Sequence, residues 1–261
     1  MNLSFFKYQG AGNDFVIIDN REALFPENDY QLVNQLCNRR FGIGADGLML
    51  LQNHPTYDFE MRYYNADGRP GSMCGNGGRC ITAFAKYLGV IKEETNFLAV
   101  DGPHYAKISA KNVSLQMIDI FDIEQQENYF VLNTGSPHYV SFVAAVQAMD
   151  VFEQGRAIRY NERFKQEGIN VNFVQEIDTN HLFVRTYERG VEDETLSCGT
   201  GMTASALCYG LNKNLLGKHV ITIDTPGGKL KIQFEQAKKG CFEQVFLDGP
   251  AELVYKGSID L

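Results

Sequence analysis

The feature that most constrains this chain is a short motif that occurs twice. Ser72-Met-Cys-Gly-Asn-Gly-Gly-Arg-Cys80 contains the kernel Cys-Gly-polar-Gly, and Ser197-Cys-Gly-Thr-Gly201 repeats it. The two cysteines, Cys74 and Cys198, lie 124 positions apart in a chain of 261 residues. A motif repeated at such a distance indicates that the chain consists of two related halves.

Each kernel precedes a segment with the pattern of a helix. The sequence predicts helices over Arg79–Leu88, ended by Gly89, and over Met202–Tyr209, ended by Gly210, because glycine commonly follows the last residue of a helix. Each cysteine is therefore expected at or just before a helix N-terminus. Unpaired N–H groups and the helix dipole favour an anion there, so both thiols are predicted to have a lowered pKa.

Two further pairs of segments repeat at nearly the same offset. Gly135-Ser-Pro-His-Tyr-Val140 follows Gly10-Ala-Gly-Asn-Asp-Phe15 by 125 positions, and Thr186-Tyr-Glu-Arg189 follows the strand that ends at Tyr64-Asn65 by about 124. We interpret these echoes as a duplication. The predicted fold is α+β, with two pseudo-symmetric half-domains of similar fold, many short strands around a central helix in each, facing each other across a cleft.

The remaining pattern is one of short strands with few helices and no regular strand–helix alternation, which is typical of α+β proteins. Residues 3–19 read as strand, glycine turn and strand, and Tyr30–Arg40 as a helix; Asp119–Glu127 is acidic and is predicted to join the halves. Further strands are expected over 48–51, 57–64, 97–100, 105–108, 113–118, 221–223, 229–234, 242–247 and 251–255.

A glycine-rich run, Gly42-Ile-Gly-Ala-Asp-Gly47, matches the spacing of a dinucleotide-binding loop. Such a loop needs a buried strand before it and a helix after it, whereas here a helix precedes and a strand-like run follows. A plain turn is therefore the better interpretation. With no phosphate-binding loop and no recognisable pyridoxal-phosphate site, the sequence predicts no cofactor, and the spacing of the cysteines predicts no metal site.

Composition limits the partners and the location. A net charge of −8 and an isoelectric point near 5.2 argue against nucleic acid and against anionic membrane surfaces as partners. No apolar stretch of about 18 residues is present, and the N-terminus lacks the pattern of a secretory signal. Six cysteines in such a chain are expected to be reduced. These features together predict a cytoplasmic protein.

Two activated thiols suit one kind of chemistry. A thiolate can remove a proton from one face of a tetrahedral carbon while a second thiol delivers a proton to the other face, which inverts the stereocentre. One thiol must be ionised and the other protonated, so the pH–rate profile should be bell-shaped. The backbone N–H groups of Gly75, Asn76, Gly199 and Thr200 are suited to hold a substrate carboxylate.

At this point the residues carry a resemblance. In combination, four segments resemble the diaminopimelate epimerase family: Gly10-Ala-Gly-Asn-Asp-Phe15, Tyr64-Asn-Ala-Asp-Gly68, Met73-Cys-Gly-Asn-Gly-Gly-Arg-Cys80, and Tyr187-Glu-Arg-Gly190 with Cys198-Gly-Thr-Gly201. The similarity continues to Gly249-Pro-Ala and Gly257, and so covers essentially the whole chain.

The resemblance implies cofactor-independent interconversion of LL- and meso-2,6-diaminopimelate, for lysine and peptidoglycan biosynthesis. It also implies a small amino-acid substrate and a homodimer. In the family the C-terminal strand returns to the first half. The implied half-domains are therefore 1–119 plus 250–261, carrying Cys74, and 120–249, carrying Cys198.

Family roles follow position by position. The resemblance implies that Cys74 and Cys198 are the catalytic thiols, with His138 near them and Glu188 facing the substrate amine. Arg189 is implied to bind the distal carboxylate. Substrate-binding roles are also implied for Asn13, Asn65, Asn170, Gly75, Asn76, Gly199 and Thr200. Two positions depart from the family pattern, because Ser136 replaces an asparagine and Gly47 replaces a glutamine.

Other interpretations remain open. Another two-cysteine epimerase, acting on proline or hydroxyproline, would use the same chemistry, although Arg189 and three asparagines favour a substrate with a polar distal end. A thiol redox sensor would use Cys74 and Cys198 as a disulfide pair. A binding protein without activity is disfavoured because both thiols are intact. Cys37, Cys80, Cys208 and Cys241 are expected to be core residues.

Overall fold

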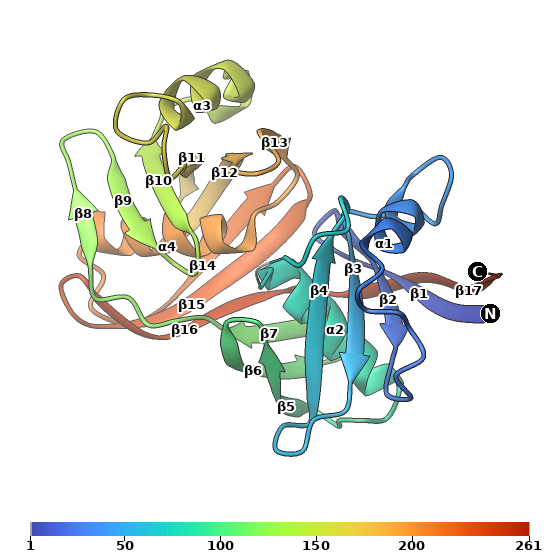
Figure 1. Ribbon diagram of the computed structural model, residues 1–261. Coiled ribbons are helices and arrows are strands. Elements are labelled where there is room, and N and C mark those ends of the chain that lie inside the picture. The colour runs from blue at the N-terminus through green and yellow to red at the C-terminus, as the bar shows by residue number, and fades with distance from the viewer. Residues whose placement is uncertain (1, 72, 261) are drawn as a thin grey trace. The chain divides into compact units, whose positions relative to one another are not determined.

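The computed structural model describes residues 2–71 and 73–260 and divides into two compact units (Figure 1). Unit 1 comprises Met1–Leu115 and Gly249–Leu261, and unit 2 comprises Gln116–Asp248. Each unit is α+β, with one long buried helix against which several short strands pack.

Unit 1 contains eight strands among its described residues, and each pairs with the next in the order β17-β1-β2-β3-β4-β5-β6-β7. The pairs β2–β3 and β4–β5 are parallel and the others antiparallel. The strands are β1 (Asn2–Gly10), β2 (Asn13–Asp19), β3 (Gly47–Gln52), β4 (Phe59–Asn65), β5 (Glu94–Ala99), β6 (Gly102–Ser109), β7 (Asn112–Gln116) and β17 (Glu252–Asp260).

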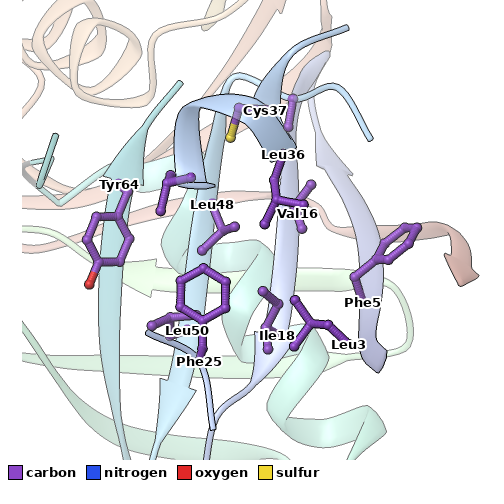
Figure 2. Close-up of a cluster of buried hydrophobic side chains, with 12 residues drawn as sticks. Leu3, Phe5, Val16, Ile18, Phe25, Leu36, Cys37, Leu48, Leu50 and Tyr64 are labelled. Carbon is purple, nitrogen blue, oxygen red and sulfur yellow. The ribbon is translucent and has the colours of Figure 1, made fainter. Parts of the chain in front are cut away.

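Two helices pack on the strands of unit 1. α1 (Tyr30–Cys37) contacts β3, and α2 (Gly75–Tyr87) contacts β1, β2, β3 and β6. A cluster of buried apolar side chains, including Leu36 from α1, Val16 from β2 and Leu48 from β3, fills the space under α1 (Figure 2). Buried and exposed residues largely alternate along β1, and α1 has one apolar face, so both elements place their apolar side chains in the same core.

Unit 2 repeats this order of elements. Its strands pair in the order β8-β9-β10-β11-β12-β14-β15-β16, and β13 (Asp193–Thr195) adds to β12. The other strands are β8 (Ile123–Gln125), β9 (Phe130–Asn133), β10 (Pro137–Phe142), β11 (Asn170–Asp178), β12 (His181–Glu188), β14 (Gly217–Thr225), β15 (Gly228–Lys238) and β16 (Cys241–Pro250). The helices are η1 (Val146–Ala148), α3 (Val151–Arg159) and α4 (Gly199–Asn212).

The duplication predicted from the sequence is visible in the strand pairing. β10–β11 and β12–β14 are the parallel pairs of unit 2, as β2–β3 and β4–β5 are in unit 1. The register repeats as well, at an offset of 123: Phe15 lies opposite Gly47, and His138 lies opposite Asn170. His138 is therefore equivalent to Phe15, and the predicted offset of 125, which aligns His138 with Asn13, is wrong by two residues. The α+β class and the two similar halves are therefore confirmed.

The predicted helix boundaries need correction. α2 and α4 begin at Gly75 and Gly199, earlier than the apolar periodicity indicated, because glycines in the first turn carry no pattern. α4 also continues past Gly210 to Asn212. A side chain at Gly210 would lie 2.7 Å from Phe234 Cζ, so this glycine serves close packing inside the helix and does not end it.

Two other expectations were wrong. α1 ends at Cys37, not at residue 40, because Asn38 is extended and its side chain accepts the backbone N–H groups of Arg40 and Phe41. The segment 119–127, predicted as a join, contains β8, and Ile120 pairs with Phe242. β8 has few apolar residues, so apolar periodicity does not predict this short strand.

Candidate active site

Cys74 is the N-cap residue of α2, and its backbone is extended (φ −109°, ψ 124°). Gly75 and Asn76 begin the helix, so their backbone N–H groups belong to the first turn, which has no intrahelical acceptors. Both residues are buried, whereas Cys74 is half-buried. The first turn of α2 thus forms an anion-favouring position beside a thiol.

The side chain of Asn13, at the start of β2, connects this thiol to the sheet. Its Nδ2 donates to Asp46 Oδ2 at 2.5 Å, and its Oδ1 accepts from Cys74 Sγ and from Asn76 Nδ2, both at 3.5 Å. A carboxylate only accepts hydrogen bonds, so Asp46 fixes which way the Asn13 amide points. Asn13 consequently presents an oxygen to Cys74.

Asn76 is oriented in turn by Arg79, one turn further along α2. Arg79 Nη2 donates to Asn76 Oδ1 at 2.9 Å, and the arginine side chain is fully buried. No sequence pattern indicates the roles of Arg79 and Asp46. Asp46 contacts Asn13, which lies 33 residues earlier in the chain, and Arg79 contacts Asn76 within the glycine-rich first turns of α2.

Asp46 and Asp14 form an ionic cluster with Arg39 and Lys7. Arg39 Nη2 lies 2.6 Å from Asp14 and 2.7 Å from Asp46, and Lys7 Nζ lies 2.7 Å from Asp14. Burial opposes the charge on Asp14, but the hydrogen bonds and charges of Arg39 and Lys7 outweigh it and hold the pKa of Asp14 well below its usual value. Asp14 therefore stays charged at neutral pH, and the cluster supports Asn13 through Asp46.

Two other positions of interest in unit 1, Asn65 and Gly47, lie side by side at the ends of neighbouring strands. Asn65 ends β4, pairs with Gly47 across the β3–β4 ladder and is exposed. A side chain at Gly47 would lie 2.5 Å from Tyr63 Cε2 and 2.6 Å from the Tyr64 carbonyl oxygen. Tyr63 therefore fills the space that a glutamine at position 47 would need, which gives a steric reason for this departure from the family pattern.

Cys198 occupies the equivalent place in unit 2. It is the N-cap of α4 with φ −111° and ψ 107°, close to the conformation of Cys74. Gly199 and Thr200 begin the helix, and Thr200 Oγ1 lies 3.5 Å from Cys198 Sγ. Thr134 Oγ1 donates to the Thr200 carbonyl oxygen at 2.8 Å, which ties this first turn to the end of β9.

His138, on β10, is completely buried. Burial, with a smaller contribution from the charge of Arg189, lowers the pKa of His138 to about 3, so the imidazole is neutral at physiological pH. Its Nδ1 lies 3.1 Å from Asn172 Nδ2, and its Nε2 has no hydrogen-bond partner among the residues that the structure describes.

Two predicted residues, Asn170 and Arg189, form a second group in unit 2 together with Ser136. Asn170 Nδ2 donates to Ser136 Oγ at 2.9 Å, and Asn170 Oδ1 accepts the backbone N–H of Arg189 at 2.9 Å. Arg189 Nη2 lies 3.5 Å from the same Ser136 hydroxyl. Ser136, the second departure from the family pattern, is thus part of this group. Glu188, beside it, accepts from Thr195 Oγ1 at 2.8 Å.

The structure therefore brings most predicted residues together within each unit. In unit 1, Cys74, Asn76 and Asn13 are connected directly, with Gly75 in the same helical turn. In unit 2, Cys198 contacts Thr200, and Asn170 contacts Arg189. Glu188 contacts Thr195, and Asn65 lies opposite Gly47 of β3.

Of the other four cysteines, Cys37, Cys80 and Cys208 are buried as expected, whereas Cys241 is only partly buried. Burial raises the pKa of the Cys37 and Cys80 thiols to about 12 in each case, and it also raises that of Cys208. Within residues 2–71 and 73–260, no group of three or more His, Cys, Asp or Glu side chains could hold a metal ion. In the same residues, no helix is long and apolar enough to cross a membrane.

Solved structures with a similar fold include two that are distant in sequence. A Bacillus anthracis phenazine biosynthesis protein of the PhzF family superposes with a TM-score of 0.79 at 13% identity and covers 100% of both chains. A hydroxyproline epimerase from Agrobacterium vitis, with bound trans-4-hydroxy-L-proline, gives 0.68 at 12% identity, covering 99% of this chain and 92% of that one. At such identities the likeness shows the fold alone.

Sequence comparison is more specific. The family model described as diaminopimelate epimerase matches residues 5–117 and 130–254. A protein named diaminopimelate epimerase from Flavobacterium psychrophilum is 49% identical over 98% of this chain and 100% of its own length. With two N-cap thiols in duplicated units and these matches along its length, the chain belongs to the diaminopimelate epimerase family.

Proposed function

We propose that this protein epimerises LL-2,6-diaminopimelate to the meso form without a cofactor, as a step toward lysine and peptidoglycan. One observation carries the proposal. Cys74 and Cys198 occupy the same N-cap position, in nearly the same backbone conformation, before two buried helices. The named activity of relatives up to 49% identical supports the choice of substrate.

In the proposed mechanism, the two thiols act on the same α-carbon. One thiolate removes the α-proton, and the other thiol delivers a proton to the opposite face. The charge that develops on the α-carboxylate is stabilised by N–H groups of the helix starts at Gly75–Asn76 and Gly199–Thr200. Units 1 and 2 each supply one thiol.

The neighbours of the two thiols favour different protonation states. Asn13 Oδ1 carries no proton and can only accept, so its contact with Cys74 favours the protonated thiol. The Thr200 hydroxyl can donate, so it can stabilise a Cys198 thiolate. We therefore assign the base to Cys198 and the acid to Cys74 in the resting enzyme, with the roles exchanged in the reverse direction.

The distal end of the substrate is assigned to the second group in unit 2. Arg189 is exposed and carries a guanidinium suited to bind a carboxylate in two places, and Asn170 fixes its backbone. Glu188 is proposed to face the amine. Asn65, at the exposed end of β4, is proposed as a further polar contact. Proline has no distal carboxylate for Arg189 to bind, which disfavours a proline epimerase.

A stereochemical assay tests this substrate assignment. LL-diaminopimelate, L-proline and trans-4-hydroxy-L-proline are each incubated with the reduced enzyme, and the products are separated by chiral chromatography. We expect meso-diaminopimelate and no product from the other two. Arg189→Gln should lower kcat/KM by about 10- to 100-fold, the loss of one charged hydrogen-bonding partner. Product from proline alone would contradict the assignment.

We also propose that the protein is cytoplasmic and forms a homodimer. Cys37, Cys80, Cys208 and Cys241 are thiols without disulfides, which suits a reducing compartment. Three consecutive apolar side chains on β17, Leu253, Val254 and Tyr255, are between 38% and 57% exposed and offer a surface for a second copy. Light scattering of the purified protein measures the mass: a dimer is expected, and a monomer contradicts the proposal.

A further inference from the structure

The side chain of Asn172 lies between His138 and two other polar groups, in the buried interior of unit 2. Asn172, His138 and Thr186 are each at most 1% exposed. Asn172 Nδ2 lies 3.1 Å from His138 Nδ1 and 2.9 Å from the Tyr139 carbonyl oxygen, and Asn172 Oδ1 lies 2.9 Å from Thr186 Oγ1. These contacts decide the orientation of the amide.

The Tyr139 carbonyl oxygen only accepts, so the amide atom that faces it must be the nitrogen. The Asn172 oxygen then faces Thr186, whose hydroxyl donates to it. An amide nitrogen has two hydrogens and no acceptor capacity. One hydrogen goes to Tyr139, and the second points at His138 Nδ1.

The orientation of Asn172 determines the tautomer of His138. Because Nδ1 accepts a hydrogen bond, it carries no proton, and the single proton of the neutral ring is on Nε2. Nε2 is buried and has no hydrogen-bond partner among the described residues. The ring therefore keeps one N–H donor that the folded chain does not use.

We propose that Asn172 is a positioning residue that holds His138 as the neutral Nε2–H tautomer, so that His138 serves the reaction as a hydrogen-bond donor and not as a base. The role of His138 in the reaction rests on the proposed function; its tautomer does not. A ring whose Nε2 already carries a proton can take a second one only at Nδ1, which would make it a buried cation and end the hydrogen bond from Asn172. The low pKa of His138 agrees with this.

The device is specific to the unit that carries Cys198. Asn172 lies opposite Thr186 in the β11–β12 ladder, and the equivalent pair in unit 1 is Met49 opposite Tyr63. The position equivalent to His138 is Phe15. Unit 1 therefore has apolar side chains, Phe15 and Met49, at the positions of His138 and Asn172.

The second glycine of the repeated motif makes room for this triad. A Cβ at Gly201 would lie 2.3 Å from Asn172 Oδ1 and 3.3 Å from Cys198 Cβ. Asn172 thus packs directly beneath the first turn of α4, next to the residue that carries the thiol.

Nitrogen NMR of the full-length protein, labelled with ¹⁵N in its five histidines, tests the tautomer. His138 is assigned by comparison with His138→Gln. We expect a protonated Nε2 and an unprotonated Nδ1 that do not change between pH 5 and pH 8. A protonated Nδ1, or an imidazolium in this range, would overturn the proposal without any variant of Asn172.

Asn172→Asp supplies the second arm. A carboxylate only accepts, so the proton should move to Nδ1 and the histidine should begin to titrate near neutral pH. If the proposed function holds, kcat should fall by roughly 10²- to 10⁴-fold, as for other enzymes with the wrong histidine tautomer. Asn112→Asp, the same charge change at an exposed site in β7, should keep wild-type activity.

The outcomes are distinguishable. An unchanged tautomer in a folded Asn172→Asp protein would overturn the positioning role. Thr186→Val keeps the Tyr139 carbonyl contact, so Nε2–H should persist in it, and a tautomer switch there would also contradict the argument. If the wild-type enzyme fails to epimerise diaminopimelate, the proposed function is wrong, but the NMR measurement still tests the tautomer of His138.

Discussion

Gly201 and Gly77 hold the same place in the two copies of the motif, but they face different side chains. A Cβ at Gly201 would lie 2.3 Å from Asn172 Oδ1, whereas a Cβ at Gly77 would lie 3.2 Å from Met49 Sδ. The amide of Asn172 is fixed by three hydrogen bonds, while a methionine side chain can shift. The same substitution should therefore have unequal effects.

We predict that Gly201→Ala lowers the free energy of unfolding by about 1–3 kcal/mol, the usual cost of overpacking, and also lowers kcat. Gly77→Ala is the matched control and should cost less. Urea unfolding and the epimerase assay measure both effects. Equal costs for the two variants would show that the amide of Asn172 yields as readily as the methionine.

Among single residues, the sequence predicted those that lie in a recognisable motif. Cys74 and Cys198 were found because the kernel around them repeats. Asp46, Arg79 and Asn172 were missed, because their importance lies in contacts with Asn13, Asn76 and His138 that the strand pairing creates. No local pattern marks an asparagine that orients a histidine.

Among the elements, β1, β2 and the segment before β3 are held together by charges. Lys7 from β1 and Arg39 from the segment after α1 both contact Asp14 in β2, and Lys7 is only 6% exposed. Lys7 Nζ also donates to the Gly44 carbonyl oxygen. This cluster fixes the start of β2, where Asn13 lies.

The pKa of Asp14 is lowered in the folded protein, so its contribution to stability is fully present above the unfolded value of about 4 and is lost as the pH falls through the folded value. Asp14→Asn should cost about 3 kcal/mol at pH 7, since it leaves Lys7 buried without its partner. The difference from wild type should shrink below about pH 4.

Asp19→Asn, on the same strand, provides the control. Asp19 pairs with Arg21 at 2.7 Å, but both side chains are about one-third exposed, so its loss should cost less than 1 kcal/mol. Urea midpoints at pH 7 and pH 3 compare the two variants. A deficit of Asp14→Asn that is the same at both pH values would contradict an ionic origin.

The elements themselves were predicted where periodicity was strong. The strands at Val16–Ile18 and Leu48–Leu51 and the core of each central helix follow from apolar patterns. The starts of α2 and α4 do not follow from such a pattern, because the glycines there pack closely against Met73 and Asn172. Packing requirements of this kind override local propensity.

For the whole molecule, the duplication explains why the two thiol sites are similar, although their neighbouring side chains differ. The strand order and the N-cap conformations repeat, so each unit presents a thiol at the start of a buried helix. The sequence predicted this architecture from three landmarks at nearly the same offset. It could not predict the asymmetry, in which one thiol adjoins an asparagine, Asn13, and the other a threonine, Thr200.

The central claim is that both thiols are needed to invert one stereocentre. The most direct measurement is proton NMR in D₂O with LL-diaminopimelate, under reducing conditions, for wild type, Cys74→Ser and Cys198→Ser. We predict deuterium at one α-carbon with formation of the meso product in wild type, and loss of epimerisation in both variants. Exchange with proline but not with diaminopimelate would move the substrate and keep the chemistry, whereas near-wild-type epimerisation by either variant would contradict the two-thiol account.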